Sequence, residues 1–94
     1  MSQAFNILLV TEFNEIREED QKEIFLRMEE HGFEKIPTVS SAWEIKMDGE
    51  DETDAKDKAI QALINIARTY PFELKMVAHA GTSQILRRRK KFEP

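Results

Sequence analysis

The spacing of apolar residues changes repeatedly along this chain, and that change constrains the fold more than any single motif. Apolar residues recur at helical spacing over residues 14–31, alternate with polar residues over 33–48, and return to helical spacing over 54–70. A period near 3.6 residues indicates an amphipathic helix, whereas a period of two indicates a strand with one buried face. The chain is therefore expected to mix helices with strands.

Two further strand-like runs flank these segments. Residues 5–13 (FNILLVTEF) form a short apolar run, and residues 72–80 (FELKMVAHA) alternate in character. The predicted order is strand, helix, hairpin, helix, strand, with the hairpin bending near Ser40 and Ser41. This order predicts an α+β fold of the ferredoxin-like split βαβ type, in which two helices cover one face of an antiparallel sheet. Residues 84–92 are expected to add an extra C-terminal strand.

Capping and helix-breaking residues set the expected ends of the two helices. Gly32 follows His31 at the position of a left-handed C-terminal cap, so the first helix should stop at His31. Thr53 precedes the second helix and is expected to cap its free amides, and Pro71 should end that helix.

Length and composition limit the architecture. The 94 residues are expected to form a single domain spanning 1–94, and the absence of cysteine excludes disulfides and thiolate metal sites. No stretch approaches the roughly 18 apolar residues of a membrane span, and no basic region followed by an apolar run marks a secretory signal. We therefore expect no membrane association and a cytoplasmic location.

Charge is distributed unevenly. Residues 1–86 contain nine Lys and Arg against 17 Asp and Glu, whereas five consecutive cations occur near the C-terminus: Arg87, Arg88, Arg89, Lys90 and Lys91. Adjacent cations repel one another and suit a polyanion, and arginine offers bidentate contacts to phosphate. The basic strand or tail at 84–94 is therefore a candidate contact for RNA or DNA.

A second interpretation of the basic run needs no nucleic acid. Charged residues at a sheet edge discourage unwanted strand pairing, and a solvated tail is an ordinary structural feature. The acidic body suits a basic partner or the basic tail itself. The tail could therefore cross onto the body of a dimer mate, or it could bind the acidic surface of another protein. Both interpretations remain open from the sequence.

Carboxylates and histidines give weaker signals. Glu12 ends the first strand and, with its symmetry mate in a dimer, could hold a hard cation such as magnesium through oxygen ligands. The simpler interpretation is that this carboxylate is solvated. His31 is expected to contact free carbonyls at a helix end, and His79 has no second group at a spacing that implies proton transfer. We assign no catalytic residue.

The stretch NILLVTEFNE, with a charged helix and then HGFEKIPTVSSAWEI, resembles two groups of small ferredoxin-like proteins. These are the CRISPR-associated adaptation and nuclease family and the GhoS type of antitoxin ribonuclease. The resemblance covers residues 5–80, mainly as an order of elements, and implies a homodimer that contacts RNA or DNA. It also places Glu12 where the family carries an aspartate at the end of the strand. Glutamate is longer by one methylene, and this departure counts against metal-dependent cleavage.

Overall fold

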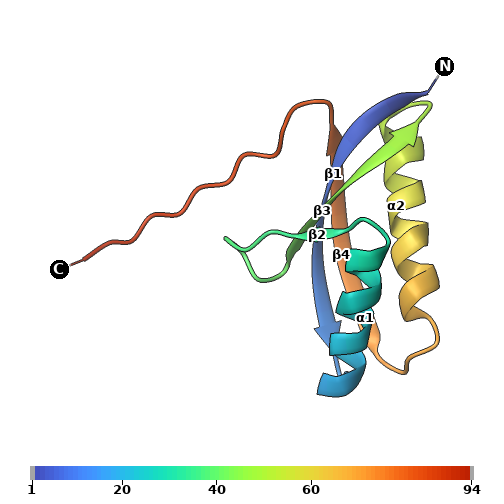
Figure 1. Ribbon diagram of the computed structural model, residues 1–94, viewed down its shortest axis with the longest axis vertical. Helices are drawn as coiled ribbons and strands as arrows, with labels where there is room; N and C mark the ends of the chain where they lie inside the picture. Colours follow the sequence, from blue (N-terminus) through green and yellow to red (C-terminus); the bar gives the residue numbers. More distant parts are fainter. Residues whose placement is uncertain (1, 94) are drawn as a thin grey trace.

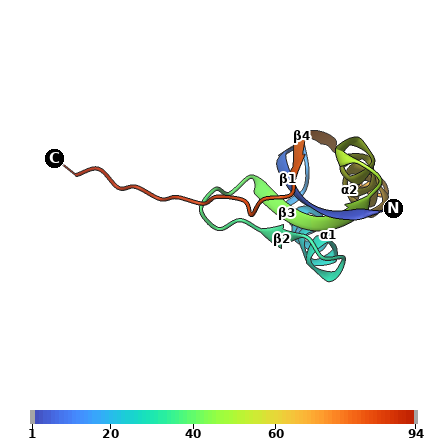
Figure 2. The same ribbon diagram turned by 90° about the horizontal axis from the view of Figure 1, so that it is seen from above.

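A computed structural model describes residues 2–93 of the chain (Figure 1). Its elements, in chain order, are β1 (Gln3–Asn14), α1 (Glu18–Glu30), β2 (Glu34–Lys35), β3 (Ala42–Gly49), α2 (Glu52–Ala67) and β4 (Glu73–Gly81). The strands form one antiparallel sheet in the order β2-β3-β1-β4, with β1 and β3 in its centre. Both helices lie on the same side of this sheet, as Figures 1 and 2 show from two directions. The predicted α+β, ferredoxin-like arrangement is confirmed.

The sheet has one covered and one open face. Along β1, Phe5, Ile7 and Leu9 are buried and belong to the core, whereas the residues between them point to the opposite side, because successive strand residues alternate. We call this opposite side the open face. It carries Asn6, Leu8, Val10 and Glu12 from β1, Glu44, Lys46 and Asp48 from β3, and Lys75, Val77 and His79 from β4.

Alanines allow α2 to lie close to the covered face. Ala55 and Ala59 are fully buried on the side of α2 that also presents Leu63 to the core. Gly49, at the end of β3, lies directly against Ala55. Small residues on both elements therefore bring the helix backbone onto the sheet.

Helix α1 begins a turn after Asn14 and ends at Glu30, close to its predicted end. Gly32 has φ 93°, a left-handed conformation that glycine adopts without steric cost, and Phe33 is buried behind it. The Phe33 amide donates to the Met28 carbonyl at 2.9 Å, which satisfies a free acceptor of the last turn. His31 directs Nδ1 to the Arg27 carbonyl at 2.7 Å, in agreement with its expected role at the helix end.

The hairpin is shorter on its first side than the alternation suggested. Only Glu34 and Lys35 form β2, and Pro37 follows in the loop that leads to β3. A proline cannot donate to a ladder, which accounts for the end of β2 before Pro37. The bend near Ser41 is fixed to β1, because the Thr11 amide donates to the Ser41 carbonyl at 2.8 Å and the Thr11 hydroxyl donates to it at 3.2 Å.

The prediction that Thr53 caps α2 is wrong. The N-cap is Asp51, whose Oδ1 accepts from the Asp54 amide at 2.8 Å, and the Asp54 carboxylate in turn accepts from the Glu50 amide at 2.9 Å. Asp51 satisfies an amide that the first turn of the helix leaves free, and Asp54 satisfies the amide of Glu50, which precedes the cap. The helix consequently starts at Glu52, and Thr53 lies within its first turn.

This correction gives a direct test by mutation. We expect Asp51→Ala to lower the free energy of unfolding by about 1 kcal/mol, because the Asp54 amide is deprived of its acceptor. Thr53→Ala should change it by less than about 0.5 kcal/mol, as for a surface substitution away from a cap. Urea unfolding of both variants, followed by circular dichroism, measures the difference. A larger destabilisation by Thr53→Ala would identify Thr53 as the cap instead.

The predicted extra strand at residues 84–92 is also wrong for the described part of the chain. After β4 the segment is extended but pairs with no strand through residue 93. Strand pairing is stabilised by side-chain pairs on a shared face. Cations alternate onto both sides of this segment, so neither side offers an apolar face to bury. The segment therefore remains an arm rather than a fifth strand.

Candidate nucleic-acid interface

The chain turns across the open face as it leaves β4. The Asn6 side-chain amide donates to the Ser83 carbonyl at 2.9 Å, which fixes the start of this turn to β1. Ile85 and Leu86 then line a groove on the open face together with Leu8 and Val10. Beyond this groove the chain projects away from the sheet on the side opposite the helices (Figures 1 and 2). We call residues 87–93 the basic arm.

The first cation of the basic arm is held against the body. The Arg87 guanidinium forms an ion pair and hydrogen bond with the Glu44 carboxylate on β3. Glu44 lies directly opposite Glu34 of β2 in the sheet register. Like charges directly opposite one another are destabilising, and Arg87 offsets this repulsion. The arm is thus anchored where two facing strands bring carboxylates together.

The following cations are directed away from the carboxylates of the body. Arg88 donates from Nη1 to the Arg87 carbonyl at 2.7 Å, and Lys90 lies over the Phe92 ring. Arg89 has no hydrogen bond or ion pair among residues 2–93. Lys91 lies 3.4 Å from Glu93, but both side chains are about three-quarters exposed, and such pairs contribute little. Arg88, Arg89 and Lys90 therefore have no carboxylate partner within the described chain.

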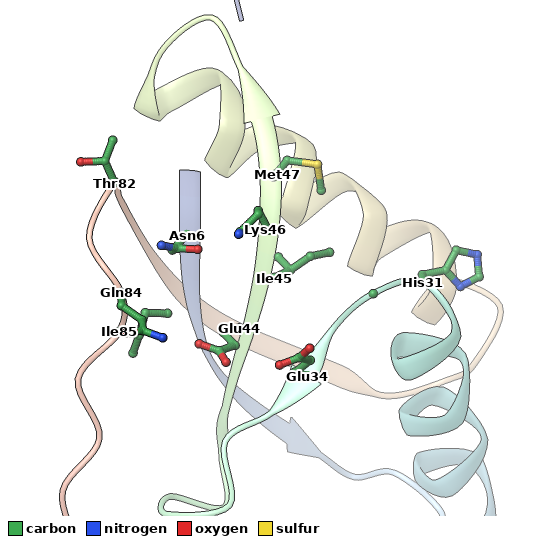
Figure 3. A pocket seen from close by; sticks show the side chains of 11 residues that line it. Asn6, His31, Glu34, Glu44, Ile45, Lys46, Met47, Thr82, Gln84 and Ile85 are labelled. Atoms are coloured by element: carbon green, nitrogen blue, oxygen red, sulfur yellow. The ribbon is translucent and has the colours of Figure 1, made fainter. Parts of the chain in front are cut away.

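A cleft of about 700 Å³ opens between the start of the arm and strand β3 (Figure 3). Figure 3 shows Gln84 and Ile85 on one side, Lys46 on β3 across from them, and Glu44 and Glu34 lower in the view. Lys46 lines this cleft together with the two carboxylates, and the Glu44 carboxylate is already paired with Arg87. The cleft therefore carries charges of both signs, whereas the cations of the arm beyond Arg87 form a segment of one sign.

Glu12 is separate from these acids. It is exposed on the open face of β1, directly opposite Lys75 of β4. Among residues 2–93 no group of three His, Cys, Asp or Glu side chains comes together as a metal site would require. A magnesium site at Glu12 would need ligands from a second copy of the chain, and it stays a prediction.

The remaining candidates belong to different parts of the molecule. His79 is exposed on β4, opposite Leu8, while His31 lies at the end of α1. Trp43 is fully buried, as expected for a core residue. Lys35 places its ammonium 4.4 Å from the Phe25 ring centroid and 4.8 Å from that of Trp43. Burial lowers the pKa of Lys35, although the carboxylate of Glu29 opposes that shift.

Sequence reasoning missed the part that Glu44 and Glu34 play. Alternation placed Glu44 on the polar side of its strand, which is correct, but gave no information about the residue opposite it. That residue is set by the register of the short β2 strand, which the loop containing Pro37 determines. Pairing the two arms about the predicted bend at Ser40 and Ser41 would have placed Pro37 opposite Glu44, because the observed loop is longer and spans residues 36–41.

Comparisons with protein-family models, with curated proteins and with solved structures found no match for this chain. No helix among residues 2–93 is long and apolar enough to cross a membrane.

Proposed function

We propose that this protein binds nucleic acid, RNA or DNA, through its basic arm. The observation that carries the proposal is that Arg88, Arg89 and Lys90 extend from the body without a carboxylate partner among residues 2–93. Guanidinium and ammonium groups in this state can replace the counterions of a phosphate backbone. The body then serves as the support from which the arm projects.

The extended shape of the arm addresses the problem posed by the acidic body. Residues 1–86 carry a net charge of -8 and would repel a polyanion at close range. Residues 89–93 in extended form span about 16 Å, whereas the Debye length at physiological salt is about 8 Å. The tip of the arm is therefore screened from the carboxylates of the body and can meet phosphates first.

The test compares two variants that each remove two positive charges. Arg88→Ala with Arg89→Ala should weaken binding of oligo(U) roughly tenfold at low salt, because two phosphate contacts disappear. The negative slope of log affinity against log salt should also become shallower by about 1.4, which is about 0.7 for each phosphate that is no longer neutralised on a single strand. Fluorescence anisotropy between about 50 and 200 mM salt measures both quantities.

The matched control removes two exposed cations from the helices, Lys22 on α1 and Arg68 at the end of α2. Lys22→Ala with Arg68→Ala produces the same net charge but leaves the arm intact. Its affinity and salt slope should stay close to those of the wild type. Equal weakening by both double variants would mean that net charge, rather than the arm, determines the affinity. Negligible binding by the wild type and both variants would end the proposal.

A second candidate function is favoured by the Arg87–Glu44 pair. This contact shows that the body of this chain can accept a cation of the arm, so an arm could also bind the acidic surface of a dimer mate or of another protein. The open face also exposes Val10 and Val77, which a second copy could cover. Loss of a homodimer in the Arg88 and Arg89 double variant, measured by solution mass, would favour this alternative.

A further inference from the structure

Phe92 stands apart from every other aromatic ring of the described chain. Its side chain is 85% exposed, on an extended segment beside the cations of the arm. The other rings are buried or half-buried in or against the core: Phe5, Phe13, Phe25, Phe33, Trp43, Tyr70 and Phe72. Folding therefore gains nothing from burying the Phe92 ring within this molecule.

The surroundings of the ring indicate what it contacts. Lys90 places its ammonium 5.6 Å from the centroid of the Phe92 ring, so a cation and an aromatic surface occur side by side. A nucleotide in a single strand offers the matching pair, a phosphate and an unstacked base. In a duplex the base faces are already stacked on their neighbours, and only base edges and phosphates are accessible.

We propose that Phe92 is a base-stacking residue and that the arm consequently selects single-stranded nucleic acid over a duplex. This inference rests on the proposed function and adds its substrate class. Cations of the arm supply phosphate contacts that any strand could satisfy, whereas the ring supplies a contact that only an unpaired base can satisfy. Stacking is tolerant of base identity, since every base has a flat face, so no sequence preference is expected.

Two substitutions at position 92 distinguish the contribution of the aromatic ring from that of an apolar side chain of similar size. Phe92→Leu keeps an apolar side chain and should weaken binding of oligo(U) about tenfold, while Phe92→Tyr keeps the ring and should bind as the wild type does. Binding to a blunt duplex of the same length should be unchanged in both. The salt slope should also be unchanged, because neither variant alters a phosphate contact.

The outcomes distinguish this inference from the proposed function. If the Arg88 and Arg89 double variant binds more weakly but Phe92→Leu binds oligo(U) like the wild type, nucleic-acid binding stands and stacking by Phe92 is overturned. Equal weakening of single-strand and duplex binding in Phe92→Leu also overturns it. A fall in solution mass for Phe92→Leu without nucleic acid would assign the ring to an interface between copies, contrary to the inference.

Discussion

Gly49→Ala is expected to lower the free energy of unfolding by about 3 kcal/mol, although the substitution adds a single methyl group. A Cβ at this position would lie 2.7 Å from the Ala55 backbone nitrogen and 3.0 Å from the Ala55 Cα. These are backbone atoms in the first turn of α2 and cannot rotate away as the end of a side chain could. The helix would have to move off the sheet, which would loosen the packing along its alanine stripe.

Gly81→Ala is the control for this prediction. No heavy atom lies within 4 Å of a Cβ built at Gly81, so its substitution should change the free energy of unfolding by less than about 0.5 kcal/mol. Urea unfolding followed by the fluorescence of Trp43, the only tryptophan, measures both variants. Similar destabilisation by the two substitutions would mean that backbone freedom, rather than contact with α2, determines the cost at Gly49.

The sequence predicts the layers of this molecule well because the buried side of each element shows as a regular spacing of apolar residues. Ile7 and Leu9 in β1, Ala55 and Leu63 in α2, and the cap at Gly32 each satisfy a local rule that the rest of the fold supports. Short-range patterns of this kind need no knowledge of which elements meet. The order of elements then restricts the topology to few arrangements.

The errors arise where two local solutions compete or where the interacting residues are distant in sequence. Asp51 and Thr53 can both cap a helix. The bond from the Asp54 amide to Asp51 and the bond from the Glu50 amide to the Asp54 carboxylate favour the earlier start. The Arg87–Glu44 pair joins residues 43 positions apart, and no periodicity reports such a contact. An alternating pattern indicates a strand only where one side of the segment is apolar and can be buried. Neither side of the basic arm is apolar, so the predicted strand does not form.

The cations of the basic arm also divide into those that contact a residue distant in sequence and those that do not. Arg87 compensates a repulsion created by strand register, so its charge is used within the fold. The next three are directed away from the body and keep their charge available to another molecule. A single run of like residues thus contains an anchor followed by the segment that we propose binds nucleic acid, and only the anchor depends on the sheet. Substitutions along the run should accordingly differ in effect although their chemistry is similar.

Trp43→Ala is expected to lower the free energy of unfolding by about 4 kcal/mol. The side chain is fully buried on β3, and its ring meets that of Phe25 edge-on, with centroids 5.0 Å apart and an interplanar angle of 70°. Phe25 belongs to α1 and Lys35 to β2, so the indole joins the helix and the edge strand to the centre of the sheet. Its removal leaves a cavity between three elements and takes a ring from beneath the Lys35 ammonium.

Trp43→Phe should be much less costly, by under about 2 kcal/mol, although it also removes volume from the core. The indole Nε1–H is buried without a hydrogen-bond partner among residues 2–93, whereas in the unfolded chain it donates to water. Leaving such a donor unsatisfied costs about 1–3 kcal/mol, and phenylalanine eliminates that cost while preserving an aromatic ring beside Phe25. Urea unfolding followed by circular dichroism measures both variants. Because both substitutions remove Nε1–H, the absolute cost of Trp43→Phe is the informative value. A cost well above about 2 kcal/mol would contradict the prediction and indicate that Nε1–H is hydrogen-bonded in the folded protein.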